Sequence, residues 1–167
     1  MILGFSTQLN GKPTYFVEKI LCSLFDHMLI SKADWEFYTK DLGSMKPHNE
    51  KYHTIREDKT DRWKPGTKID FFINCRQKNM FRFAPVLPVV HVQKVWILWA
   101  TKYMAIVEVD DKYLGNAIWN RSFLGMSCDP KVRELSVNDG FDTVEDFFRY
   151  FDKDFKGKII HWTDLKY

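Results

Sequence analysis

Hydrophobic residues in the N-terminal part of the chain recur at the spacing of one helix face. Seven apolar positions carry this pattern: Phe16, Val17, Ile20, Leu21, Leu24, Phe25 and Met28. Pro13 and Thr14 stand just before them, where helices commonly begin. The pattern predicts one helix over about residues 15–30. The only other helical stretch indicated before residue 50 is ADWEFYTK at 33–40.

The C-terminal part predicts a second amphipathic helix that is rich in phenylalanine. Its apolar positions follow the period i, i+3, i+4 and i+7: Val144, Phe147, Phe148 and Phe151. Asp142 precedes Glu145 in an arrangement similar to a capping box, and this spacing predicts where the helix starts.

Alternation of apolar and polar residues, rich in β-branched and aromatic side chains, predicts strands in five segments: 2–6, 68–75, 89–98, 105–110 and 158–162. A Lys-Pro-Gly-Thr turn at 64–67 precedes the second strand, because proline presets the first central dihedral of a type II turn and glycine supplies the positive one. Pro85 and Pro88 are expected at a sheet edge or a bulge. Residues 111–131 show no clear period and are predicted to form a loop.

These elements predict a single α+β domain over residues 1–167, an open sheet or a small barrel with helices at its edges. With 45% hydrophobic and 16% aromatic residues, the chain can bury a core. The N-terminus lacks the basic region of a secretory signal, and the longest apolar run, 95–100, is far shorter than the ~20 residues that cross a bilayer. We therefore expect a soluble, cytoplasmic protein without a membrane partner.

Cysteines and histidines show no metal or redox pattern. The cysteines are odd in number and form no C-x-x-C pair, so buried free thiols are expected: Cys22, Cys75 and Cys128. The histidines form no H-x-x-x-H or H-E-x-x-H motif: His27, His48, His53, His91 and His161. Glycine-rich phosphate loops are absent, and GMSCD around Ser127 lacks the last glycine of a nucleophile elbow. No metal or cofactor is predicted. His91 is interpreted as structural, and His161 as structural or pocket-lining.

The positive charge of the chain is concentrated around one segment. The net charge is +3, from 25 basic and 22 acidic residues. Residues 40–68 hold eight basic residues against five acidic ones, which accounts for the whole excess. Such an excess fits either a polyanionic partner or a solvated loop with interleaved charges.

Within this segment, Lys51, His53, Thr54 and Arg56 are candidates for chemistry. Residues two apart in a strand share a face, so Thr54 and Arg56 could line one pocket, and Lys51 joins them only if the chain turns or bulges before Thr54. A threonine hydroxyl needs a base to act as a nucleophile, and a lysine can serve when burial leaves it neutral. The simpler alternative is that Thr54 only favours a strand and that Arg56 pairs with Glu57 or Asp58.

The chain resembles the ASCH domain family, a branch of the PUA-like superfamily, in four segments: KYHTIRED at 51–58, WKPGTKID at 63–70, NDGFDTVEDFFRYF at 138–151 and KGKIIHWT at 156–163. The LGFS sequence near the N-terminus is a weaker match. The resemblance implies a small, partly closed β-barrel with flanking helices, and a cleft where the K-x-x-T-I-R segment meets the loop before the D-G-F helix. It also implies that segments around 25–48, 76–104 and 111–131 are insertions.

Members of this family are proposed to bind RNA or modified nucleosides, and the resemblance implies such a partner here. A bacterial branch hydrolyses N4-acetylcytidine with a lysine, a threonine and a glutamate. These fall on Lys51, Thr54 and, as an aspartate one methylene shorter, on or near Asp139. In those roles Thr54 would attack the acetyl carbonyl, Lys51 would accept its proton, and Asp139 would shuttle a proton to the departing amine. Arg56 would position the base or sugar.

Three functions follow from this comparison. As a binding module, the protein would hold phosphates with its cations and stack bases on its tryptophans. The residues of that site would be Lys51, His53, Thr54, Arg56, Arg62, Trp63, Lys64 and Trp162. The simpler alternative places both tryptophans in or beside the core. The other two functions are an amidohydrolase acting on N4-acetylcytidine and a protein-interaction domain that uses the inserted segments.

Overall fold

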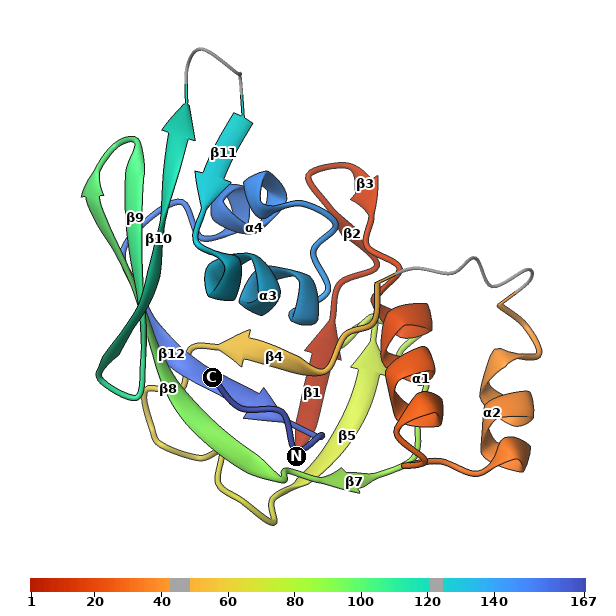
Figure 1. Cartoon of the computed structure of the whole chain (residues 1–167). Helices are drawn as coiled ribbons and strands as arrows, with labels where there is room; N and C mark the ends of the chain where they lie inside the picture. Colours follow the sequence, from red (N-terminus) through yellow and green to blue (C-terminus); the bar gives the residue numbers. More distant parts are fainter. Residues whose placement is uncertain (43–48, 121–124) are drawn as a thin grey trace.

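The computed structural model describes residues 1–42, 49–120 and 125–167. His48, one of the histidines considered above, lies outside them. The chain is a mixed α+β structure, built mostly of strands, with helices on its flanks (Figure 1). This confirms the predicted α+β class.

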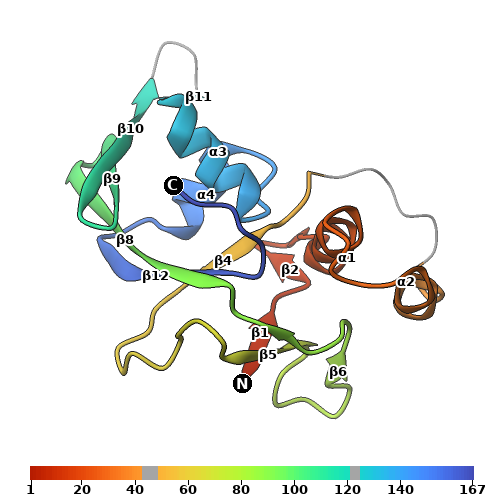
Figure 2. The same cartoon turned by 60° about the horizontal axis from the view of Figure 1, so that its bottom comes forward.

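Six strands within the described ranges form one antiparallel sheet in the order β11-β10-β9-β8-β12-β4. Their bounds are β4 His53–Arg56, β8 His91–Thr101, β9 Met104–Val109, β10 Lys112–Asn120, β11 Gly125–Cys128 and β12 Phe155–His161. Register shifts between Trp99 and Thr101 and between Tyr113 and Gly115 interrupt the ladders, and such bulges bend strands. The sheet accordingly curls into a half-barrel (Figures 1 and 2).

A second, smaller sheet begins at the N-terminus. Strand β1, Ile2–Phe5, runs parallel to β5, Lys68–Ile73, and the short strands β6, Phe81–Arg82, and β7, Leu87–Pro88, pair antiparallel with β5. Pro88 thus lies in a short edge strand, as predicted. Between β1 and the first helix, β2, Gln8–Leu9, and β3, Lys12–Pro13, form a hairpin. Its turn residues Asn10 and Gly11 both have positive φ, as a two-residue type I′ turn requires.

Four helices are described: α1 Phe16–Asp26, α2 Lys32–Thr39, α3 Pro130–Asn138 and α4 Val144–Tyr150. Helix α1 confirms the N-terminal prediction but ends earlier than residue 30. Helix α2 buries no residue, and its capping box joins Ser31 and Asp34. Helix α4 confirms the phenylalanine-rich prediction, yet its cap is Thr143, whose hydroxyl accepts from Asp146 N. The Asp142 and Glu145 pairing expected there was therefore wrong.

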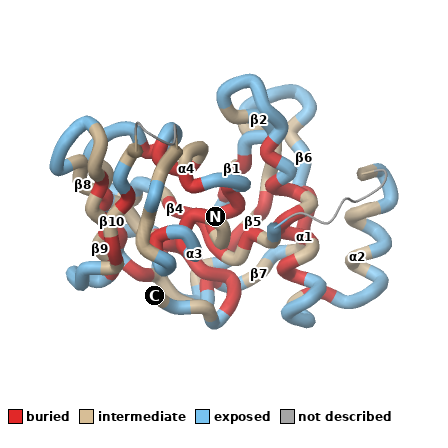
Figure 3. The backbone as a smooth tube through the Cα atoms, turned by 45° about the horizontal axis from the view of Figure 1, so that its top comes forward, coloured by how far each residue is buried: buried red, intermediate tan, exposed pale blue. Residues whose placement is uncertain are grey.

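Two hydrophobic cores lie on opposite faces of β12. One core is built by β1, β5 and α1 with Trp63 and Trp162, and it contains Ile160. The other packs α3 and α4 against the curled sheet and contains Ile159. Successive residues of a strand point to opposite faces, so one strand serves both cores. The buried segments, red in Figure 3, follow this division, while α2 carries only exposed and intermediate positions.

Residues 111–131 are not a loop, contrary to the prediction. The described part of this segment holds β10, β11 and the start of α3. Small residues hide the pattern, because the buried positions of β10 are Gly115 and Ala117. A Cβ on Gly115 would lie 2.7 Å from Asp129 Cβ and 2.9 Å from Val132 Cγ2, so α3 packs too closely for a larger side chain. Hydrophobic periodicity cannot detect a strand whose inward residues are this small.

The three cysteines are free thiols, as predicted, but they are half-buried rather than buried as the sequence suggested. Within the described ranges, no helix combines the length and apolar character needed to cross a membrane.

Candidate functional site

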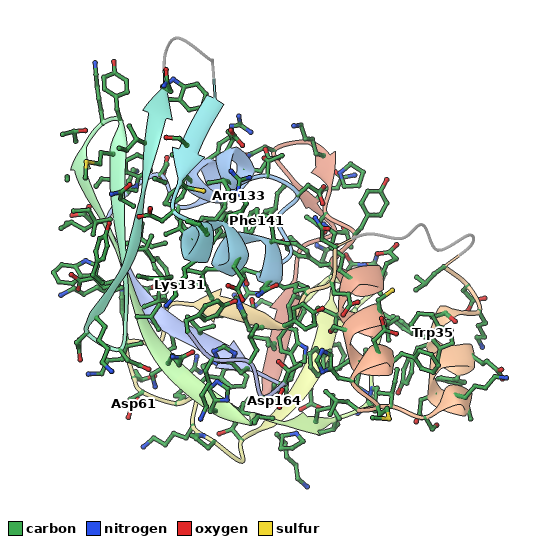
Figure 4. The ribbon with its side chains drawn as sticks, in the orientation of Figure 1. Trp35, Asp61, Lys131, Arg133, Phe141 and Asp164 are labelled. Carbon is green, nitrogen blue, oxygen red and sulfur yellow. The ribbon has the colours of Figure 1, made fainter. Side chains whose placement is uncertain are left out.

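The segment Lys51–Arg56 and the turn after α3 enclose one pocket. Residues from both of these regions line it, together with aromatic and apolar side chains: Ser6, Leu9, Phe16, Lys51, Thr54, Ile55, Arg56, Asp139, Phe141 and Tyr150. Figure 4 labels Phe141, which lies near the α3–α4 turn. The structure thus brings Lys51, Thr54, Arg56 and Asp139 together, although Asp139 follows the other three by more than eighty residues in the sequence.

Lys51 reaches the pocket because it precedes the strand. Strand β4 begins only at His53. Before it, Lys51 N donates to Lys19 O of α1 at 3.2 Å, and Ser23 Oγ donates to Lys51 O at 2.7 Å. Tyr52 N donates to Asn138 O at the end of α3. The chain is therefore clamped between α1 and α3, which supplies the turn that the sequence analysis required for Lys51 and Thr54 to share one pocket.

The turn that carries Asp139 is the C-terminal cap of α3. Gly140 N donates to Val137 O and Phe141 N donates to Ser136 O, and Gly140 has a φ of 89°. These bonds form a Schellman motif, in which glycine takes the left-handed position. Asp139 and Gly140 therefore end helix α3 and precede the start of α4 at Val144. A Cβ at Gly140 would also lie 2.9 Å from Lys51 Cδ, so glycine leaves room for the lysine.

Lys51 and Asp139 form a buried ion pair in which Nζ lies 2.7 Å from Oδ1. The ammonium also donates to the Asp139 carbonyl, at the negative end of the α3 dipole. Asp139 Oδ1 accepts a second bond, from Ile55 N at 3.1 Å, on the outer edge of β4. The Asp139 carboxylate thus holds the Lys51 ammonium in place and also accepts a hydrogen bond from the backbone N–H of Ile55 in the edge strand β4.

Burial sets the charge states of this pair. Burial lowers the pKa of Lys51 to about 8, although Asp139 acts in the opposite direction. Burial alone would raise the pKa of Asp139, but the Lys51 charge and the hydrogen-bonding partners outweigh it and lower that pKa below its usual range. Asp139 is therefore a carboxylate at neutral pH, while Lys51 gives up its proton more readily than an exposed lysine.

His53 lies behind the pocket rather than in its lining. Its Nε2 is 2.7 Å from the Tyr167 hydroxyl, which also accepts from Asn138 Nδ2. Burial raises the pKa of Tyr167, so its hydroxyl stays protonated. On the other side of the ring, His53 Nδ1 is buried without a hydrogen-bond partner and lies 3.7 Å from Asp139 Oδ1. His53 is therefore a neighbour of Asp139 and is not among the pocket-lining residues.

Three histidines form a ladder across neighbouring strands. His53 of β4 is paired with His161 of β12, and His161 with His91 of β8. The His91 and His161 rings stack with centroids 4.0 Å apart. His161 is completely buried and, like His91, is absent from the pocket lining, which fits the structural interpretation.

Arg56 lines the pocket and keeps its charge unpaired. Its Nη2 donates to Gly4 O at 2.7 Å, and the guanidinium lies over the Phe5 ring. Its Nε is buried without a hydrogen-bond partner. No carboxylate among the described residues lies within 4.0 Å of its nitrogens, whereas Asp58 pairs with Lys158 and Glu57 with Lys59. The alternative that Arg56 pairs with Glu57 or Asp58 is therefore wrong.

The remaining predicted binding residues lie elsewhere. Trp63 and Trp162 are 5% and 1% exposed and belong to the first core, so neither offers a ring face to a base. Arg62 and Lys64 project from the loop around Asp61, near Asp58 and Asp61 respectively. Figure 4 labels Asp61 near the lower edge of the molecule, well away from Phe141. The structure does not bring these four residues to the pocket.

The β2–β3 hairpin, which the sequence analysis did not identify, borders the pocket. Leu9 lines it together with Phe16, Phe141 and Tyr150, and the same four residues line a second hollow on the other side, beside Lys19 and Asp142. The Asn10-Gly11 dipeptide is a recognised hairpin signal, so the sequence contained the information. Among the residues that the structure describes in the segments 25–48, 76–104 and 111–131, none lines the pocket.

No group of three or more histidine, cysteine or carboxylate side chains in the described ranges is arranged to hold a metal ion. Comparisons with known proteins add no assignment, because no protein-family model, curated protein or solved structure matches the chain.

Proposed function

We propose that this protein binds a nucleoside in the pocket formed by Lys51, Thr54, Arg56 and Asp139. The observation that carries the proposal is the convergence of these four polar residues with three aromatic rings on one cavity. Small-molecule sites are typically concave and mostly apolar, with a few polar groups that fix orientation. A nucleoside combines a flat ring with several hydrogen-bonding groups and matches such a lining.

Each polar residue has capacity for a ligand. Lys51 uses bonds to Asp139, and an ammonium carries three N–H groups, so one is left for an acceptor on the base. Arg56 has an unsatisfied Nε, and Thr54 can both donate and accept. Phe16, Phe141 and Tyr150 provide apolar surface against which a base can pack.

The pocket must widen before a base can enter. Its volume is about 20 Å³, room for one or two water molecules. The neighbouring hollow measures about 60 Å³, and the two share four lining residues, of which Leu9 is the one that the hairpin contributes. Displacement of the β2–β3 hairpin would join them. Short two-stranded hairpins are marginally stable, so this opening is inexpensive in free energy.

Isothermal titration calorimetry with cytidine and N4-acetylcytidine tests this proposal. Thr54→Val keeps the shape of the side chain and removes its hydroxyl, and we expect affinity to fall about tenfold, the cost of one buried hydrogen bond. Thr101→Val, at the exposed β8–β9 turn, is the matched control and should leave affinity unchanged. Absence of binding by both nucleosides at millimolar concentration would refute the proposal.

A second function, hydrolysis of N4-acetylcytidine, is favoured by one observation: a lysine with a pKa of about 8 lines the same pocket as a threonine hydroxyl. Neutral Lys51 would take the Thr54 proton as Oγ1 attacks the acetyl carbonyl. The resulting ammonium would return a proton to the departing exocyclic amine as the C–N bond breaks, leaving cytidine and an acetyl ester on Thr54. Water, deprotonated by Lys51, would then release acetate.

In this scheme Asp139 has a different role from the one that the resemblance implies. Its lowered pKa keeps it ionised, so it orients Lys51 instead of delivering a proton. Chromatography of the products after incubation with N4-acetylcytidine provides the test. Thr54→Ser should retain measurable turnover and Thr54→Val should lose it. If wild-type protein yields no cytidine above a buffer control, the enzymatic function fails while nucleoside binding can still hold.

The third expectation, a protein-interaction domain, stays a prediction. The described residues of the segments on which it rests do not line the pocket.

A further inference from the structure

A polar hollow lies directly beside the Lys51 pocket, at the carboxyl ends of β1 and β5. Its volume is about 420 Å³, and it is lined by Gly4, Phe5, Ser6, Thr7, Gln8, Asn74, Cys75 and Gln77. The two strands run parallel with Phe5 opposite Ile73, so the chain leaves both at the same edge and the following segments lie side by side. Ser6 lines both this hollow and the Lys51 pocket, which makes them neighbours.

The segment after β5 is held by its own hydrogen bonds. Gln77 N donates to Asn74 O at 3.0 Å, and Asn74 Nδ2 donates to Asn79 O at 3.4 Å. Across the hollow, a Cβ on Gly4 would lie 2.7 Å from Cys75 Sγ. Strand β1 and the segment that follows β5 therefore approach each other as closely as a glycine at position 4 permits. The shape of the hollow is thus set by the hydrogen bonds within the segment after β5 and by its close contact with β1.

The electrostatics of the hollow favour an anion. None of its described lining residues is acidic, and five of them carry uncharged side chains with N–H or O–H donors, Ser6, Thr7, Gln8, Asn74 and Gln77. The lining comes from two stretches without any aspartate or glutamate, residues 1–17 and 71–107. Arg76 and Lys78 flank Gln77 in the second stretch and are exposed. Within the described lining, an anion would meet neutral hydrogen-bond donors and no carboxylate.

Arg56 connects the hollow to the pocket. Its guanidinium bonds to Gly4 O and covers Phe5, two residues of the hollow, while the residue also lines the Lys51 pocket. Lys51 is neutralised by Asp139, but Arg56 has no carboxylate within 4.0 Å in the described structure, and its Nε is buried without a partner. A buried donor on a cation without a counter-charge is costly, and an anionic ligand group would satisfy it.

We propose that this hollow is a phosphate subsite, and that the ligand is a nucleotide whose base or sugar enters the Lys51 pocket while its phosphate binds between Arg56 and the Ser6–Gln8 and Asn74–Gln77 segments. This inference rests on the proposed nucleoside binding and names its substrate class. The phosphate is either the terminal group of a mononucleotide or the internucleotide group of an RNA strand.

Calorimetry with four probes tests the subsite: cytidine, its 5′-monophosphate, its 3′-monophosphate and a five-nucleotide cytidine-containing RNA. At least one phosphorylated probe should bind about tenfold more tightly than cytidine, the gain of one charge-assisted contact. A gain with a monophosphate identifies a terminal phosphate, and a gain with RNA alone identifies an internucleotide phosphate. Raising the salt concentration should reduce the gain and leave cytidine binding nearly unchanged.

Thr7→Asp places a negative charge in the hollow at an exposed position. It should remove most of the gain from the phosphate and leave the affinity for cytidine within about twofold. Thr101→Asp makes the same charge change at the β8–β9 turn and should preserve the gain. Circular dichroism checks that both variants fold.

The results distinguish this inference from the proposal beneath it. If cytidine binds and no phosphorylated probe binds more tightly, the subsite is refuted and nucleoside binding stands. If the phosphate helps but Thr7→Asp costs no more than Thr101→Asp, the phosphate binds elsewhere and the subsite is again refuted. A third outcome is that the phosphorylated probes bind, cytidine does not, and Thr7→Asp weakens the binding of the phosphorylated probes. This outcome would support the subsite and refute nucleoside binding as stated.

Discussion

At the scale of single residues, the most informative group is the Lys51 amine. Burial lowers its pKa to about 8, and Asp139 opposes that change by favouring the charged form. We expect Lys51 to titrate near pH 8, and Asp139→Asn to lower its pKa further because the opposing charge is removed. NMR of protein with ¹³Cε-labelled lysine measures this, with Lys51→Arg identifying the resonance. A Lys51 signal that titrates above pH 10 would contradict the prediction.

The same ion pair predicts an asymmetric effect on stability. Asp139→Asn keeps an acceptor for Ile55 N but removes the counter-charge of Lys51, so the buried amine must either stay an unpaired ammonium or give up its proton, and the free energy of unfolding at pH 7 should fall by about 3 kcal/mol. Adding Lys51→Met removes the stranded charge and should recover about half of the loss.

Urea unfolding of the single and double variants measures both effects. Asp111→Asn is the control, because Asp111 pairs with Lys94 at the surface, where such a pair contributes little. A double variant no more stable than Asp139→Asn alone would show that the uncompensated charge is not the cause.

At the scale of elements, the β2–β3 hairpin should control entry to the pocket. Leu9→Ala would shorten the hairpin side chain that lines both hollows and enlarge the space there, so the association rate of a ligand should rise several-fold. Leu114→Ala is a matched control, because Leu114 is also partly buried and packs against one of the two cores that Leu9 contacts, but lines neither hollow. Stopped-flow fluorescence with pyrrolocytidine, a fluorescent cytidine analogue, measures the rates. Equal rates in the two variants would mean that the hairpin does not gate the pocket.

Elements with a strong period were predictable, and those defined by small residues or by capping were not. The apolar faces of α1 and α4 are visible in the sequence, as is the β-branched alternation of β8 and β9. Strand β10 was not predicted because its buried residues, Gly115 and Ala117, are too small to give a hydrophobic alternation. Helix α3 was missed although Pro130 at its first turn and Gly140 after its end are ordinary helix boundaries.

The site was predictable only in part, because its residues are joined by packing. A two-residue period correctly placed Thr54 and Arg56 at one pocket. The loop at 57–67 folds against Lys158. This contact places Trp63 in the core and leaves Arg56 unpaired. No local sequence pattern encodes it.

At the scale of the whole molecule, the pocket lies where the two cores meet. Leu9 packs against both cores, and the neighbouring residues Ile159 and Ile160 of β12 belong to one core each. Strand β12 also holds β4, which carries Thr54 and Arg56. The residues that would bind a ligand are therefore fixed by the same strands that unite the cores, and loss of either core should disturb the pocket.

The histidine ladder across β4, β12 and β8 makes the stability of the whole molecule sensitive to acid. Burial lowers the pKa of His53, and burial together with the neighbouring histidines lowers the pKa of His161, so both rings are neutral when folded. Asp139 favours protonation of His53, whereas Lys51 opposes it and Lys166 opposes it at His161. The unfolded chain binds these protons below about pH 6.5 and the folded chain does not, so stability is retained at higher pH and falls as the pH drops.

Each ring that stays neutral can contribute a loss of up to about 1.4 kcal/mol per pH unit below that point. Urea unfolding at pH 7.5, 6.5 and 5.5 should therefore show a steep decline in wild-type protein. His161→Phe removes one titrating ring while keeping a stacking surface for His91, and it should make the decline shallower. His27→Gln, at an exposed histidine, should leave the slope unchanged. If the stability of wild-type protein is the same at pH 7.5 and 5.5, the ladder does not stay neutral in the folded chain, because a neutral ladder requires the unfolded state to gain protons over that interval.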